Sequence, residues 1–277
     1  MALFDTLILI RGAGDLGSGV AYRLFKAGFP IAMTELAHPL LVRTTVSYGA
    51  CVHNGGVIVG GVAARRVSYA QVPEMIMHDV ISVIVDSSRE AIAALRPTVV
   101  IDARVAKVNL DTTLQDAPLV IALGPGFTAG VDCHAVIETN RGHHLGRVIW
   151  EGSAEPDTGQ PGNVNGKVGD RVLRAPVDGA VTQVVVVGEY VQAGAIIARV
   201  ADQPIIAPFD GVLRGLVDND TVVRAGLKIG DLDPRAKREY CFTISDKSLA
   251  IGGGAVEAVL SAPQLQGVLH RSKLDAR

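Results

Sequence analysis

The fold of the N-terminal half is decided by Leu7-Ile8-Leu9-Ile10-Arg11-Gly12-Ala13-Gly14-Asp15-Leu16-Gly17. An apolar run comes first, a glycine-rich turn follows, and a helix-like stretch then continues to Ala27. The spacing of Gly12, Gly14 and Gly17 is that of the G-x-G-x-x-G fingerprint of dinucleotide-binding folds. In that fingerprint the first glycine permits the turn, the second lets a pyrophosphate approach the backbone, and the third lets helix and strand pack closely.

An acidic residue follows at a suitable distance. Glu35 ends the second apolar run, 18 residues after Gly17, where a carboxylate can accept a hydrogen bond from a ribose 2′-OH. Asp15, in the first helical turn, competes with a phosphate for the positive end of the helix dipole. The cofactor-binding candidates are therefore Gly12, Gly14, Asp15, Gly17 and Glu35, and a purely structural role for the glycines stays open.

Further short apolar runs alternate with helix-like stretches. The runs are residues 30–35, 81–86, 98–102 and 119–123, and helix-like stretches fall at residues 69–77 and 87–95. Strands buried on both faces and separated by helices predict a Rossmann-like, doubly wound, mostly parallel α/β sheet. The Gly- and Val-rich residues 55–66 are interpreted as an inserted hairpin.

Polar residues follow the run at 98–102. Asp102 and Arg104 should lie at the carboxyl edge of the sheet, where open α/β folds bind ligands. They are candidates for catalysis, and a salt-bridged loop is the alternative.

The segment after residue 123 carries the densest polar cluster. Gly124 and Gly126 could shape an anion-binding loop, and His134, Arg141 and His143 are the catalytic candidates beside it. No metal site is predicted, because His134 and Glu138 are four residues apart on a strand and so stand roughly 13 Å apart at ~3.3 Å per residue. A connector with surface histidines is the alternative.

A sequence repeat marks the C-terminal half. Ala175-Pro-Val-Asp-Gly179 returns as Ala207-Pro-Phe-Asp-Gly211, and Val191-Gln-Ala-Gly194 returns as Val223-Arg-Ala-Gly226, both 32 residues later. Eight of the 20 aligned positions are identical, which predicts two interlocking β halves.

The repeated A-P-x-D-G phrase resembles lipoyl and biotinyl carrier modules, which implies an all-β barrel-sandwich. Those modules carry their group on a lysine at the hairpin joining the halves, here residues 201–204. No lysine occurs between Lys167 and Lys228, so we expect a non-covalent role.

Three regions follow from these patterns. Residues 1–165 are predicted to form the Rossmann-like nucleotide-binding domain, residues 166–235 the lipoyl/biotinyl-like β module, and residues 236–277 a C-terminal helical segment. The helix should span about 245–260 with Ser245 as its N-cap. Its three glycines, 252–254, suggest that this segment packs closely on the first domain.

Composition bounds the class of protein. The chain has 277 residues, a formal net charge of −2 and a mean hydropathy of +0.32. We find no apolar run of the ~18–20 residues that a membrane span needs, and no signal peptide. Three cysteines without a C-x-x-C pair fit a reducing compartment, so a cytoplasmic location is expected. The charge balance argues against nucleic acid as a partner, and neither a nucleic acid nor a membrane is expected.

Several phrases together resemble the accessory proteins of selenium-dependent molybdenum hydroxylase systems, relatives of the xanthine dehydrogenase maturation factors. They include Gly12-Ala-Gly-Asp-Leu-Gly17, Asp102-Ala-Arg104, Gly124-Pro-Gly-Phe-Thr-Ala-Gly130 and Gly230-Asp-Leu-Asp-Pro-Arg235. The resemblance implies maturation of a molybdenum hydroxylase, with the hydroxylase or its maturation machinery as partner. It also implies a dinucleotide-type ligand, with the molybdopterin dinucleotide form of the molybdenum cofactor as one candidate.

An NAD(P)-dependent oxidoreductase is the alternative function. It would use Glu35 for the ribose and the region of Asp102, Arg104 and His134 for chemistry. Against it, the chain offers no clear acid–base couple near a hydride acceptor. A homo-oligomer is among the expected assemblies.

Overall fold

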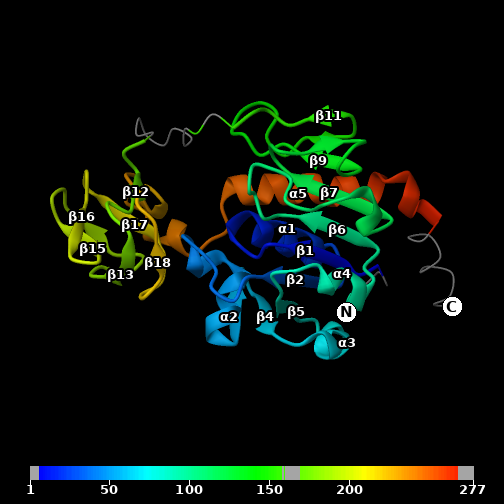
Figure 1. Ribbon diagram of the computed structural model, residues 1–277, viewed down its shortest axis with the longest axis horizontal. Coiled ribbons are helices and arrows are strands. Elements are labelled where there is room, and N and C mark those ends of the chain that lie inside the picture. Colours follow the sequence, from blue (N-terminus) through cyan, green and yellow to red (C-terminus); the bar gives the residue numbers. More distant parts are fainter. Residues whose placement is uncertain (1–5, 158, 160–168, 268–277) are drawn as a thin grey trace. The chain divides into compact units, whose positions relative to one another are not determined.

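The computed structural model describes residues 6–157, 159 and 169–267. The chain folds into two compact units (Figure 1). The first unit comprises Met1–Ala37, Tyr48–Asp157 and Ser245–Arg277, and the second comprises His38–Ser47 and Thr158–Ile244. The second unit therefore includes residues 38–47, which were expected in the first domain. It also includes residues 236–244, which were expected in the C-terminal helical segment.

A nine-stranded sheet organises the first unit, in the order β10-β9-β7-β6-β1-β2-β5-β4-β3. The inner strands are parallel, and β10 and β3 run antiparallel to their neighbours at the two edges. The strands are β1 (Ile8–Arg11), β2 (Ile31–Glu35), β3 (Gly56–Val59), β4 (Val62–Arg66), β5 (Ile81–Val85), β6 (Val99–Asp102), β7 (Leu119–Leu123), β9 (Ala135–Ile137) and β10 (Val148–Ile149). A separate pair joins β8 (Thr128–Ala129) to β11 (Gly152–Ser153).

Helices connect these strands. They are α1 (Asp15–Lys26), α2 (Cys51–Asn54), α3 (Val72–Met77), α4 (Glu90–Leu95) and α5 (Asp246–Ser261). α1 connects β1 to β2, a step toward the β3 edge of the sheet. α3 connects β4 to β5 and α4 connects β5 to β6, and both of these steps run toward the β10 edge. Because parallel crossovers are right-handed, α3 and α4 lie on the face of the sheet opposite to α1. α3 and α4 accordingly pack with Leu9, Ala32 and Val100 in one apolar cluster.

The segment at 55–66 is a hairpin, β3–β4, as expected, but it is not an appendage. β4 pairs in parallel with β5, so the hairpin extends the main sheet. Two short antiparallel strands, β9 and β10, flank the polar residues 140–143.

α5 confirms the expected C-terminal helix and its N-cap. The Ser245 side chain accepts a hydrogen bond from the Ser248 backbone N–H, 3.1 Å away. A Cβ on Gly252 would lie 2.6 Å from the Gly19 carbonyl oxygen, so the backbones of α5 and α1 cross in close contact. Ser248 Oγ also donates to Asp15 Oδ1 at 2.9 Å. Gly252 therefore permits a helix–helix approach that a larger residue would block.

The second unit consists of two four-stranded antiparallel sheets, β12-β19-β17-β14 and β16-β15-β13-β18. Their strands are β12 (Val172–Arg174), β13 (Gly179–Gln183), β14 (Tyr190–Val191), β15 (Ile196–Val200), β16 (Gln203–Ile206), β17 (Gly211–Leu216), β18 (Val222–Val223) and β19 (Lys228–Asp233). Side chains from both sheets, including Val181, Ile197, Leu213 and Leu232, fill one buried core.

The repeated phrases hold the two halves of this unit to each other. Asp178 Oδ1 accepts from the Ala225 N–H at 2.8 Å, and Asp210 Oδ1 accepts from the Ala193 N–H at the same distance. The aspartate of each A-P-x-D-G phrase thus binds the V-x-A-G turn of the other half. The expected interlocking of the halves is confirmed, and the repeat has a direct structural reason.

Segment 38–47 belongs to the second unit through specific hydrogen bonds. Arg43 Nη2 donates to the carbonyl oxygens of Tyr240 and Thr243 at 2.9 and 3.2 Å. Thr45 Oγ1 donates to the Cys241 carbonyl oxygen at 2.5 Å. The segment packs here because it satisfies the backbone around the 3₁₀ turn Arg238–Cys241.

Replacing Gly252 by alanine should destabilise the protein, whereas replacing Gly253 should stabilise it. A Cβ at Gly252 meets backbone atoms of Gly19, and such overpacking costs about 1–3 kcal/mol. Gly253 has nothing within 4 Å of its Cβ position, so alanine there gains about 1 kcal/mol of helix propensity. Urea denaturation of both variants gives the two free energies of unfolding, and equal effects would contradict the close crossing of α1 and α5.

Candidate functional site

The sheet of the first unit has a topological switch point between β1 and β6. The chain leaves β1 toward β2 on one side and later returns to β6 on the other, so the connections that follow β1 and β6 lead to strands on opposite sides of this pair. Ligands of open α/β sheets bind in such a crevice. Gly12 has φ +102°, and a Cβ there would lie 2.8 Å from the Ala103 carbonyl oxygen. Glycine is therefore required where the two loops touch.

Most polar backbone atoms of the glycine loop are bonded within the unit. The Gly12 N–H donates to the Thr34 carbonyl oxygen at 2.9 Å. The Ala13 carbonyl oxygen accepts from the Gly49 N–H at 2.9 Å and from Ser18 Oγ at 3.0 Å. A Cβ on Gly17 would overlap the Gly12 carbonyl oxygen. The loop is thus rigid, and part of the glycine pattern serves packing.

Glu35 lies beside this loop, with its carboxylate fixed in place. Oε2 accepts from the Ala13 N–H at 2.9 Å, and Oε1 accepts from the Leu36 N–H at 2.8 Å. The side chain is partly exposed, and each carboxylate oxygen can accept a further hydrogen bond. Glu35 is therefore an oriented acceptor at the carboxyl edge.

An ion-pair network joins the ends of β1 and β6 to the loop that follows. Arg11 binds both carboxylate oxygens of Asp111, at 2.8 and 2.9 Å. Arg104 Nη2 donates to Asp102 Oδ2 at 2.6 Å and to Asp111 Oδ1 at 2.7 Å. Thr112 Oγ1 donates to Asp102 Oδ2 at 2.6 Å. The bidentate and shared bonds fix the positions of all five side chains. We call these five residues the switch-point network.

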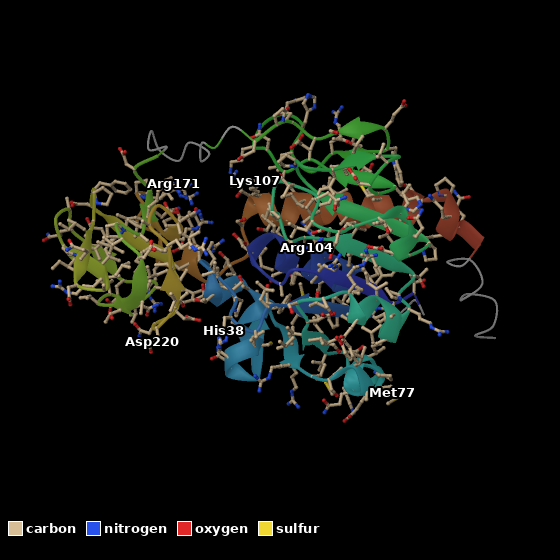
Figure 2. All side chains as sticks on the ribbon, viewed as in Figure 1. His38, Met77, Arg104, Lys107, Arg171 and Asp220 are labelled. Atoms are coloured by element: carbon tan, nitrogen blue, oxygen red, sulfur yellow. The ribbon has the colours of Figure 1, made fainter. Side chains whose placement is uncertain are left out.

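Charges inside the switch-point network stabilise one another. The hydrogen bond from Arg11 lowers the pKa of Asp111 to about 2, against the opposing effect of burial. Burial would lower the pKa of Arg104, but its bonds to Asp102 and Asp111 raise it. The side chain of Arg104, which is labelled in Figure 2, is 22% exposed. Its Nη1 has no hydrogen-bond acceptor within the described residues. Arg104 therefore offers one unused donor at the site.

The loop after β6 is strained. Val105 has φ +51° and Lys107 has φ +65°, conformations that cost about 1–3 kcal/mol each outside glycine. Gly126 supports the loop, because a Cβ there would lie 2.5 Å from the Lys107 carbonyl carbon. Lys107 Nζ lies 2.6 Å from Asp157 Oδ2. Such strain recurs at binding sites, where neighbouring contacts hold it in place.

The predicted catalytic candidates do not form one group. Asp102 and Arg104 lie together, but His134 Nδ1 accepts from the Val120 N–H near the opposite, amino end of β7. Arg141 forms two hydrogen bonds with Asp246 at the start of α5, and the exposed His143 ring contacts His144.

The predicted cofactor-binding residues fall at two places on the same edge. Gly12, Gly14 and Glu35 surround the turn after β1, and Asp15 is held there by Ser248. Gly124 and Gly126 follow β7, and a Cβ on Gly124 would overlap Thr139 Oγ1.

Sequence reasoning missed Asp111 and Thr112, the two members of the switch-point network that lie farthest along the loop. Neither follows an apolar run or belongs to a recognised motif. Arg11 ends a buried strand, and its 4% exposure is the reason it needs a buried acid. The position of Arg11 at the end of an apolar run is the sequence signal that could have indicated a buried ion pair.

Two cysteines of the first unit are buried thiols. Burial raises the pKa of Cys51 to about 11 and that of Cys133 to about 12, so both stay protonated at neutral pH. Among residues 6–157, 159 and 169–267, no three His, Cys, Asp or Glu side chains are grouped to hold a metal ion.

In the same part of the chain, none of the helices has the length and apolar character needed to cross a membrane.

Comparison with curated proteins gives one informative relative. The chain is 47% identical over 255 residues to the uncharacterized protein YqeB of Escherichia coli (strain K12). The match covers 92% of this chain and 47% of YqeB, so the chain spans about half the length of that relative. No protein-family model matches the chain.

Comparison with solved structures gives distant similarities. A succinylglutamate desuccinylase/aspartoacylase from Rhodobacter sphaeroides matches at TM-score 0.22 and 16% identity, covering 49% of this chain and 58% of that one. An aspartoacylase family protein from Mesorhizobium loti MAFF303099 matches at TM-score 0.24 and 9% identity, covering 76% and 58%. TcdA (CsdL) matches at TM-score 0.30 and 14% identity, covering 99% and 89%. These scores are too low to define the fold or chemistry of this chain.

These comparisons correct the family and function expected from sequence. No family model matches the chain and the curated relative is the uncharacterized YqeB, not a molybdenum hydroxylase accessory protein, so that assignment is withdrawn together with its oxidoreductase alternative. The expected fold class is corrected as well. A mixed α/β fold with a large, mostly parallel sheet is present, but the lipoyl/biotinyl-like barrel-sandwich assignment is withdrawn, because no family model matches the chain. A shared short phrase such as A-P-x-D-G reflects a local turn and does not identify a family.

Replacing Asp111 by asparagine should lower the free energy of unfolding by about 1 kcal/mol at pH 7, and the deficit should vanish near pH 2. A carboxyl with a lowered folded-state pKa stabilises the protein above its ordinary pKa of 3.8, and this contribution is lost as the pH falls through about 2. The full shift would correspond to about 2.4 kcal/mol, but Asp111 is 35% exposed and solvent screens part of it.

Urea denaturation of both proteins at pH 7, 4 and 2 measures this difference. Asp202→Asn is the control, since Asp202 is exposed in the β15–β16 hairpin. A deficit that persists unchanged to pH 2 would show that Asp111 does not act through its charge.

Proposed function

We propose that the first unit binds a nucleoside phosphate at the carboxyl edge between β1 and β6. The observation that carries this proposal is the Glu35 carboxylate, which two backbone N–H groups hold beside the glycine loop. An acceptor fixed in this way at the end of β2 suits a ribose hydroxyl. The rest of the crevice supplies groups suited to a phosphate.

The ribose would lie over Glu35. The Ala13 and Leu36 N–H groups orient both carboxylate oxygens of Glu35, and each oxygen can accept a further hydrogen bond. Vicinal ribose hydroxyls are two such donors. Leu36, which is 50% exposed, provides apolar surface next to them.

The phosphate would lie between the start of α1 and Arg104. Gly14 is the N-cap of α1, has no side-chain capping bond and is partly exposed, so the helix end presents N–H groups and a positive dipole. Asp15 Oδ1 accepts from Ser248 Oγ. The Arg104 guanidinium adds positive charge and the unused Nη1 donor from the other side of the crevice.

The switch-point network is assigned a positioning role in this site. The oxygens of Asp102 and Asp111 bind Arg11, Arg104 and Thr112, so neither carboxylate is left as a general base. The network holds Arg104 in place and supports the strained loop after β6. Binding without turnover is therefore the activity that these residues favour.

We place this activity in the cytoplasm. Cys51, Cys133 and Cys241 are all buried free thiols, which suits a reducing compartment.

Isothermal titration calorimetry with ADP, GDP, CDP and UDP tests the proposal. We expect at least one nucleotide to bind with a micromolar Kd, and its 2′-deoxy counterpart to bind about tenfold more weakly, since a hydrogen bond to a charged group contributes about 1.5–3 kcal/mol. Glu35→Gln should remove that discrimination, and Arg104→Gln should weaken diphosphates more than the free nucleoside.

Glu74→Gln is the matched control, because Glu74 lies exposed in α3 away from the crevice. Thermal unfolding of each variant shows whether it is folded. Failure of all four nucleotides to bind, or equal affinity for ribose and deoxyribose forms, would reject the proposed function.

A further inference from the structure

A second cavity opens at the other end of the same sheet. Its volume is about 580 Å³, and its lining includes Leu114, Gly130, His134, Trp150, Pro263 and Gln264. His134 pairs with Val120, near the start of β7, whereas Asp102 at the switch point pairs with Ala122, near its end. The cavity thus lies toward the amino end of β7 and is separate from the proposed nucleotide site.

The walls of this cavity are mainly apolar. Leu114, Pro263 and Trp150 contribute apolar or aromatic surface, and among the described residues no lysine or arginine lines it. Trp150 is the single tryptophan of the chain and is 39% exposed. Small-molecule sites are typically concave, about 300–1,000 Å³ in volume and apolar, with few polar groups placed for orientation. This cavity has that size and composition.

His134 supplies an oriented polar group. Its Nδ1 accepts from the Val120 N–H at 3.0 Å, and its own backbone N–H donates to the Val120 carbonyl oxygen at 2.8 Å. These two bonds clamp the residue, and the acceptor role of Nδ1 puts the ring proton on Nε2. Burial lowers the pKa of His134, so the ring is neutral at pH 7.

The outer nitrogen of this ring is available. Nε2 has no hydrogen-bond partner within the described residues. A neutral ring clamped through Nδ1 therefore offers a single N–H donor, at the wall of an apolar cavity. The chemistry of a suitable ligand follows from that donor and from the indole beside it.

We propose that this cavity binds a small, uncharged, planar aromatic molecule that carries a carbonyl oxygen. The aromatic ring packs against Trp150, since offset and edge-to-face ring pairs add about 0.5–1.5 kcal/mol to apolar burial. The carbonyl oxygen accepts the hydrogen bond from His134 Nε2. A charged ligand is disfavoured because, among the described residues of the lining, no cation compensates for the loss of its hydration.

Benzamide is the probe that tests this site, and cyclohexanecarboxamide is its matched control. The two molecules carry the same amide, and only the first has a planar aromatic ring. Acrylamide quenching of tryptophan fluorescence reports on the cavity alone, because Trp150 is the only tryptophan. We expect saturating benzamide to lower the quenching constant about twofold, as ring packing shields the indole, and cyclohexanecarboxamide to leave it nearly unchanged.

His134→Asn separates the two roles of the imidazole. Asparagine Oδ1 can still accept from the Val120 N–H, but the variant lacks the outer N–H donor. We expect benzamide to bind about tenfold more weakly to it, with little change in thermal stability. His143→Asn, at an exposed histidine outside the cavity, should bind benzamide like the parent protein.

Three results would overturn the proposal: no protection by benzamide, equal protection by cyclohexanecarboxamide, or unchanged benzamide affinity in a folded His134→Asn variant. None of these results bears on nucleotide binding, since Glu35 and Arg104 do not line this cavity.

Discussion

The bidentate ion pair between Arg11 and Asp111 is the interaction on which the candidate site depends. Arg11 ends a strand buried in the middle of the sheet, where an unpaired guanidinium would be costly. Asp111 reaches it from the loop that follows β6 and also binds Arg104. A single carboxylate therefore ties the ends of two neighbouring strands to a loop with two strained residues, and it orients the guanidinium of Arg104.

The two edges of the sheet carry different chemistry. The carboxyl edge combines glycine turns, a fixed carboxylate and an arginine, which suits a polar, phosphorylated ligand. The amino edge carries a mainly apolar cavity with the oriented, neutral His134 in its wall, which suits an uncharged aromatic ligand. In the second unit, Asp178 and Asp210 make the same reciprocal bonds between the repeats, so the repeated phrases are explained by stability alone.

Sequence patterns correctly predicted those features that depend on residues close together in the chain. The turn at Gly12, the acid at Glu35 and the N-cap at Ser245 all lie where the sequence placed them. The bond from Asp111 to Arg11 spans 100 residues and has no local pattern, so it was missed. His134 was grouped with Arg141 because they are close in sequence, but they belong to opposite ends of short strands.

Hydrogen–deuterium exchange of the Arg11→Gln variant tests the central claim most directly. If the pair with Asp111 holds the loop after β6, the amides of residues 103–112 should exchange about tenfold faster in the variant, a loss of about 1.4 kcal/mol of local stability, while those of α1 stay unchanged. Unchanged exchange in residues 103–112 of a folded variant would contradict the account, because the loop would then be held by other contacts.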